Sequence, residues 1–142
     1  MNRLNWKSLC LPLLACGFAG CSQSGPTMHR VTGTVAFAGA PVPDGWIIFS
    51  PDTTANNAGP QGRARIQNGK FDTAGEDGQG AVAGPTLVRI EAFDGQATDA
   101  AFNGNPIMAP YEMSLEMPGK KSAQDFDVPA TWASQKFAQG PP

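Results

Sequence analysis

Apolar and polar residues alternate along several short stretches of the chain. Between residues 30 and 37, Val31, Val35 and Phe37 fall on one face of an extended backbone, and Thr32 and Thr34 fall on the other. The same period of two recurs at residues 62–66, 86–93, 111–117 and 123–128. Because successive side chains on a β-strand point to opposite faces, this pattern predicts half-buried strands.

Two further strands and the connections between them complete the predicted fold. Residues 46–50, WIIFS, form a short apolar run typical of a buried central strand, and Phe71 begins a return strand after Asn68-Gly69. Asn-Gly favours a type I′ hairpin turn because both residues tolerate positive φ. The chain therefore predicts an all-β fold, a seven-strand antiparallel β-sandwich over residues 29–129. Residues 130–142 are expected to form a short helix or a disordered tail.

The N-terminal segment has the pattern of an export signal. Arg3 and Lys7 precede an apolar run at residues 9–20, which is shorter than the ~20 residues needed to span a bilayer. The run ends in FAGC, a lipoprotein box that predicts acylation of Cys21, and LLAC offers Cys16 as the alternative. Residues 1–20 are then the lipoprotein signal peptide, and the polar residues 21–28 are a flexible tether.

The cysteine positions agree with export and lipidation. Cleavage before Cys21 removes Cys10 and Cys16, so the exported domain keeps no cysteine pair for a disulfide or a zinc site. The sequence therefore predicts a protein of the cell envelope, lipid-anchored to the outer membrane or to a membrane facing the periplasm.

The order of several motifs resembles a known domain family. VTGTVAFAGAPVPDGWIIFSP, then GKF, then VAGPTLVRIEAF, then YEMSLEMPGKKSAQDFDV resembles the carboxypeptidase regulatory-like, transthyretin-related (prealbumin-like, Ig-like) β-sandwich of small planctomycete-type lipoproteins. The likeness covers residues 30–129 and departs from the family where Gly84-Pro85-Thr86-Leu87 replaces the usual Gly-x-Tyr. The resemblance implies a non-catalytic surface or accessory module.

Composition and charge argue against several function classes. The formal net charge of −2 at pH 7 gives no basic surface for nucleic acid. His29, the one histidine, precedes the first predicted strand, with no nucleophile or ligand set around it. The sequence predicts no catalytic residues, no enzyme activity and no cofactor. Asp72, Glu76 and Asp77 crowd one loop and are weak calcium candidates, because their spacing departs from known calcium loops.

The aromatic residues supply the remaining candidate site. Trp46 and Tyr111 lie on predicted strands and are expected in the core. Phe102 lies in a long loop, and Trp132 and Phe137 lie in the C-terminal segment, where they either contact a partner or pack back over an open end of the sandwich. We expect a structural or interaction module with an envelope protein or a glycan as partner. The alternative is a carbohydrate-binding accessory module of a polymer-degrading system.

Overall fold

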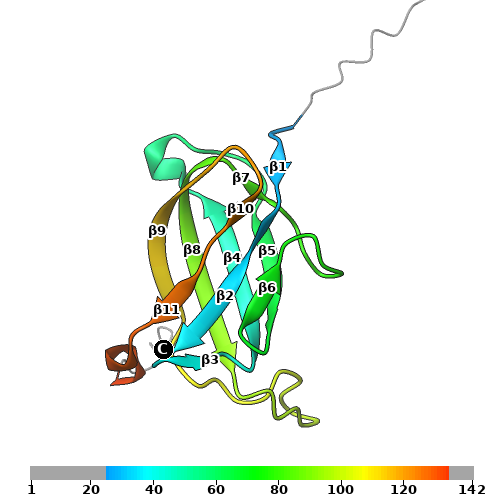
Figure 1. The fold of residues 1–142 in the computed structure, drawn as a ribbon, viewed down its shortest axis with the longest axis vertical. Helices are drawn as coiled ribbons and strands as arrows, with labels where there is room; N and C mark the ends of the chain where they lie inside the picture. The colour runs from blue at the N-terminus through cyan, green and yellow to red at the C-terminus, as the bar shows by residue number, and fades with distance from the viewer. Residues whose placement is uncertain (1–24, 135–142) are drawn as a thin grey trace, which may run out of the picture.

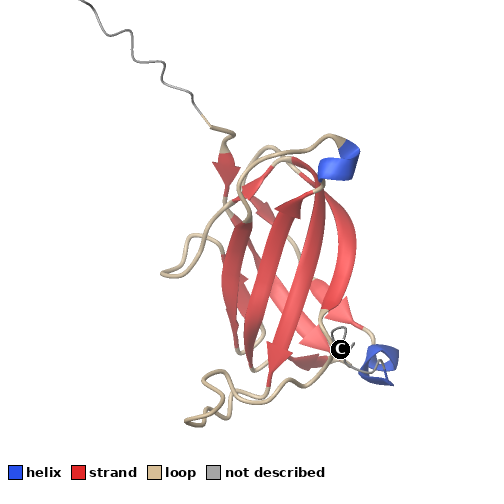
Figure 2. Ribbon diagram, turned by 180° about the vertical axis from the view of Figure 1, so that it is seen from behind, coloured by secondary structure: helices blue, strands red, loops and turns tan. Residues whose placement is uncertain are grey.

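The computed structural model describes residues 25–134, which form strands joined by turns and two short 3-10 helices. Figure 2 shows how strands dominate this part of the chain. The strands and helices are β1 (Met28–His29), β2 (Val31–Phe37), β3 (Ala40–Pro41), β4 (Asp44–Pro51), η1 (Thr53–Ala55), β5 (Gly62–Gln67), β6 (Lys70–Asp72), β7 (Ala81–Val82), β8 (Gly84–Phe93), β9 (Tyr111–Met117), β10 (Ser122–Ala123), β11 (Phe126–Val128) and η2 (Ala130–Ser134).

The seven strands expected from the sequence are all present, and the all-β prediction is confirmed. They correspond to β2, β4, β5, β6, β8, β9 and β11. The four additional strands, β1, β3, β7 and β10, are two residues long each. A segment of two residues is too short to show an alternation of apolar and polar side chains, so the sequence pattern does not predict these strands.

One curled sheet contains most of the strands. Its order is β10-β2-β6-β5-β4-β8-β9, with β3 and β11 also paired to β2, whereas β1 pairs with β7 in a separate ribbon. The curl brings β2 and β11 in front of β4 and β8, so the sheet encloses its own core in the manner of a sandwich (Figure 1).

The pairing departs from the all-antiparallel expectation at one edge. Strands β10 and β11 run parallel to β2, whereas the other pairs are antiparallel. Strand β9 ends at the pole where β2 begins (Figure 1), so the chain that follows β9 runs beside β2 in the same direction. The alternation of side chains reveals that a strand forms, but it carries no information about the direction of its partner.

Gly33 allows the chain to pass from β10 to β11 beside β2. β10 pairs with Val31 and Thr32, and β11 begins its pairing at Val35, so the connection passes Gly33. A Cβ at position 33 would lie 1.7 Å from the backbone oxygen of Gln124. Any side chain here would therefore overlap the backbone, and the close approach requires glycine.

The β5–β6 connection is the type I′ turn that its sequence predicts. Asn68 and Gly69 have φ values of 49° and 73°, which place both residues in the left-handed region. This conformation matches the twist of the flanking strands. Gln67 and Lys70 therefore face each other directly across the hairpin.

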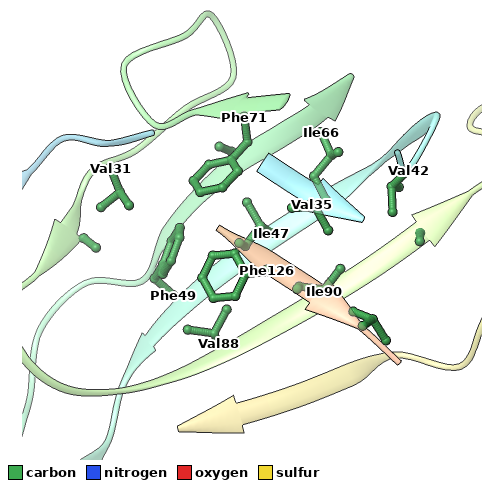
Figure 3. Packing of buried hydrophobic residues seen from close by; sticks show 14 of the residues in the cluster. Val31, Val35, Val42, Ile47, Phe49, Ile66, Phe71, Val88, Ile90 and Phe126 are labelled. Atoms are coloured by element: carbon green, nitrogen blue, oxygen red, sulfur yellow. The ribbon is translucent and has the colours of Figure 1, made fainter. Parts of the chain in front are cut away.

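The core lies between the two layers of the curled sheet. Three aromatic rings, those of Phe49, Phe71 and Phe126, form its centre, with ring centroids 6.1 Å apart in each successive pair. Figure 3 shows these rings among aliphatic side chains from the surrounding strands. The residues that contribute are those of the predicted inward phase, including Val31, Val35, Ala64, Ile66, Val88, Ile90, Ala92 and Val128.

Candidate functional site on the outer face of the sheet

The outer face of strands β5, β4 and β8 carries an apolar stripe between arginines. Trp46 and Ile48 lie two residues apart on β4 and are half-buried, and Leu87 on β8 is 44% exposed. Leu87 pairs with Ser50, so the three side chains follow a diagonal across the two strands. We refer to Trp46, Ile48 and Leu87, with the flanking Arg63, Arg65 and Arg89, as the outer platform.

Trp46 lies on this outer face, so the expectation that it belongs to the core is wrong. On β4 it is Ile47 and Phe49 that point inward, with exposures of 0% and 1%. The run WIIF is apolar in both phases, so its own pattern does not decide which face is buried. The partner strands decide: Ile47 pairs with Ala64 and Ile90, both buried.

Arg65 and Arg89 are fixed at the platform's margins by carboxylates. Arg65 donates two hydrogen bonds to Asp44, from Nε at 3.1 Å and from Nη2 at 2.7 Å. Arg89 donates to Glu91 at 2.9 Å and to Glu112 at 3.0 Å. These hydrogen bonds raise the pKa of both guanidinium groups. Both arginines are therefore held in place with their charge largely satisfied.

Arg63 differs from its two neighbours in lacking a carboxylate partner among residues 25–134. Its guanidinium carbon lies 5.6 Å from the centre of the Trp46 ring, a cation–π arrangement. The Arg63 residue is exposed and pairs with Ile48 across the β4–β5 ladder. The platform thus combines an indole, two aliphatic side chains and one accessible cation.

The sequence does contain a sign of the outer platform, namely apolar residues at strand positions that face outward. In residues 86–93, Val88, Ile90 and Ala92 take the inward phase, and Leu87 is an apolar residue in the outward phase. Trp46 and Ile48 are also apolar residues in the outward phase, once the register of β4 is known. Apolar residues on the solvent side of several neighbouring strands indicate a contact surface rather than a core.

Phe102 lies in the loop between β8 and β9 and is 85% exposed. The loop is organised around Asp94, whose carboxylate accepts hydrogen bonds from the amides of Gln96 and Asn105, each at 2.9 Å. These bonds, that from Gln96 foremost, lower the pKa of Asp94. Thr98 and Ala101 exchange two backbone hydrogen bonds immediately before Phe102. The loop therefore presents Phe102 on a defined turn. Figure 1 shows the loop between β8 and β9 at the pole opposite to β1.

Trp132 packs back onto the sandwich, one of the two arrangements that the sequence allows. Its ring meets the Tyr111 ring edge-on, at 5.1 Å between centroids and 89° between planes. Its indole Nε1 donates a hydrogen bond to the backbone oxygen of Ala109 at 3.0 Å. Tyr111 is half-buried and packs against the core from the inner face of β9. Phe137 lies outside the described residues.

The three calcium candidates line one open groove beside β2, β5 and β6, with a volume of about 550 Å³. Asp72 is held there by Arg30, whose Nε donates to Oδ1 at 2.9 Å and whose Nη2 donates to Oδ2, and by the Ala74 amide. The bond from Arg30, followed by that from Ala74, lowers the pKa of Asp72 to about 2. Glu76 and Asp77 are exposed. Within residues 25–134 no group of three or more His, Cys, Asp and Glu side chains is arranged to hold a metal ion.

The remaining candidates are the histidine and the cysteines. His29 is half-buried in β1 and pairs with Ala81. Cys16 and Cys21 lie outside the described residues, so their proposed processing stays a prediction from the sequence. In the described part of the chain, no helix has the length and apolar character needed to cross a bilayer.

The comparisons with known proteins give no family for this chain. No family model matches it, and a search of curated proteins found no match. The resemblance to carboxypeptidase regulatory-like domains therefore stays a prediction that rests on the motifs of residues 30–129.

Proposed function

We propose that the protein is a non-catalytic lipoprotein of the cell envelope, anchored through Cys21, that presents its β-sandwich as an interaction module. The observation that carries this proposal is the outer platform. Trp and Arg are the residue types most enriched among the side chains that dominate binding energy at protein interfaces. Here Trp46 and Arg63 stack on each other and are joined by Ile48 and Leu87 on a solvent-facing sheet.

The arrangement of the chain supports display of this surface away from an anchor. The described chain enters at β1, at one pole, and the Phe102 loop lies at the opposite pole (Figure 1). The outer platform lies on strands that run between these poles. A tether before residue 29 would therefore leave both the platform and the Phe102 loop accessible to a partner.

The test measures binding of the full-length protein, kept in detergent, to washed envelope fractions from the source cells. We expect Trp46→Ala to weaken binding by roughly 30-fold or more, as for a central interface residue. Ala123→Ser, an exposed substitution on β10 at the other end of the strand order, is the control and leaves binding unchanged. Protease treatment of the envelope fraction removes the binding if the partner is a protein. Equal binding by the Trp46→Ala protein would contradict the proposal.

Lipid anchoring needs its own measurement, the intact mass of the membrane-extracted protein beside a Cys21→Ser variant. We expect a mass that corresponds to residues 21–142 with two or three acyl chains, and its loss in the variant. An unacylated protein, or one that begins at Cys16, would contradict anchoring at Cys21.

A carbohydrate-binding accessory module is the second candidate, and the position of Trp46 favours it. An aromatic ring on an open sheet face offers a stacking surface for a sugar ring, and Phe102 offers a second one at 85% exposure. Trp132 is less suited, because its ring and its indole N–H are already engaged by Tyr111 and Ala109. Binding that survives protease but is lost after periodate oxidation of the envelope glycans, and that falls in Trp46→Ala or Phe102→Ala, would support this candidate over a protein partner.

A further inference from the structure

Strand β9 forms an open edge of the curled sheet. Within residues 25–134 it pairs with β8 alone, along its whole length from Tyr111 to Met117. In an antiparallel ladder every second residue directs its N–H and C=O away from the one partner, so an edge strand offers unpaired backbone groups. Figures 1 and 2 show β9 on the flank of the molecule.

The side chains of β9 divide this edge into an apolar and an acidic half. Tyr111, Met113 and Leu115 lie on the inner face, where they pack against the core and remain half-buried. Glu112 and Glu116 lie on the outer face and are exposed. A strand added to this edge would thus meet apolar side chains on one face and carboxylates on the other.

The carboxylates at this edge are available to an incoming cation. Glu116 makes no hydrogen bond or ion pair with any described residue, and Glu112 is bonded to Arg89 while its side chain stays 64% exposed. Among basic residues, Arg89 lies opposite Glu112 on the neighbouring strand β8, and Lys120 and Lys121 lie in the connection from β9 to β10.

Pairing with a second copy of the chain through β9 is disfavoured by the same charges. An antiparallel pair centred on Ser114 would place Glu112 of one copy opposite Glu116 of the other, and an in-register parallel pair would also oppose equal charges. Like charges directly opposite each other destabilise a sheet. The occupant that complements this edge is therefore a strand of opposite charge.

We propose that the β9 edge binds an extended segment of another protein by strand addition, with Lys or Arg at alternate positions and apolar residues between them. The backbone supplies the hydrogen bonds, the basic side chains meet Glu112 and Glu116, and the apolar ones lie beside Met113 and Leu115. This inference goes beyond the proposed function, because it uses a different surface and does not depend on the outer platform.

The test measures binding of a capped seven-residue peptide of alternating lysine and valine to the full-length protein by fluorescence anisotropy. Seven residues match the length of β9. We expect saturable binding, slower amide hydrogen exchange in β9 on addition of the peptide, and an affinity that falls with salt. Glu116→Lys replaces an attraction by a repulsion, so we expect it to weaken binding by about fivefold to tenfold.

Glu76→Lys is the matched control, because it makes the same change of net charge at an exposed glutamate in the loop after β6. It should bind the peptide as the wild type does, and so should Trp46→Ala, which separates this test from that of the outer platform. A peptide of alternating glutamate and valine, and a lysine–valine peptide with alternate amides N-methylated, should not bind. Absence of binding by the lysine–valine peptide, equal weakening by Glu116→Lys and Glu76→Lys, or undiminished binding of the N-methylated peptide would each overturn the proposal.

Discussion

The two faces of strand β4 differ in what surrounds them, although their residues alternate along one chain. Ile47 and Phe49 are enclosed by the facing layer of the curled sheet, as the contact of Phe49 with Phe71 shows. Trp46 and Ile48 are half-buried, and their cross-strand partners Arg65 and Arg63 lie on the same face, with Arg63 stacked on Trp46. The inner face is therefore specified by packing from several strands at once, and the outer face by pairwise neighbours on adjacent strands.

We expect the largest loss of stability from removing a large side chain on the inner face of β4. Phe49→Ala removes one of the three aromatic rings at the centre of the core, and we expect it to lower the free energy of unfolding by about 3–5 kcal/mol. Denaturant unfolding of the full-length chain measures this loss. Trp46→Ala, on the other face of the same strand, should cost about 1 kcal/mol, mostly its contact with Arg63. Equal costs would mean that both faces of β4 are enclosed, and the comparison would fail.

Gly33→Ala tests how tightly the backbone of β2 packs against the backbone of the segment that joins β10 to β11. The new Cβ would overlap the Gln124 backbone oxygen, so β10 and β11 would have to shift from β2, and we expect a loss of about 3 kcal/mol. Gly25→Ala is the control, because a Cβ there meets no atom within 4 Å, and it should be neutral. A neutral Gly33→Ala would show that the β10–β11 segment adjusts without cost.

The sequence predicts the inner face better than the outer one, and the reason is physical. Val88, Ile90 and Ala92 alternate with Arg89 and Glu91, so burial and charge select the same phase. In WIIF both phases are apolar, and only the neighbouring strands select one. The outer platform depends on side chains brought together by register between β5, β4 and β8, which alternation within a single strand does not encode.

The sequence does not predict the parallel pairing of β10 and β11, and it gives the packing of Trp132 over an open end of the sandwich only as one of two arrangements. Both depend on where the chain arrives after β9 and after β11, which is a property of the assembled sheet. Phe102 is the one weak binding candidate whose exposed position follows from its loop sequence, since GQATDAAFNGNP has no strand period.

Trp132 lies at the margin of the core, where its ring is partly buried and packs against Tyr111 at the start of β9. Trp132→Ala loses the edge-on contact with Tyr111 and the hydrogen bond to Ala109, and we expect a loss of about 2 kcal/mol. Trp132→Phe keeps an aromatic ring and should recover about half of this, measured by denaturant unfolding. A wild-type stability for Trp132→Ala would mean that η2 contributes nothing to closing the sandwich.

The smallest expected effect belongs to the ion pair between Arg30 and Asp72, because both side chains are partly exposed, at 46% and 36%. Asp72→Asn should cost less than about 1 kcal/mol near neutral pH, as for other solvent-screened pairs. The pKa of Asp72 lies at about 2 in the folded chain, below its ordinary 3.8. Its contribution is therefore fully present above pH 3.8 and is lost as the pH falls through about 2.

Thermal unfolding of the wild type and of Asp72→Asn across this pH range measures the contribution directly. The difference between the two proteins should be constant above pH 3.8 and should shrink toward zero as the pH approaches 2. Arg30→Gln provides the partner control, and the double variant should be no less stable than either single one, because the two changes remove the same interaction. A difference that persists unchanged at the lowest pH would show that the ion pair does not account for the stability lost in Asp72→Asn.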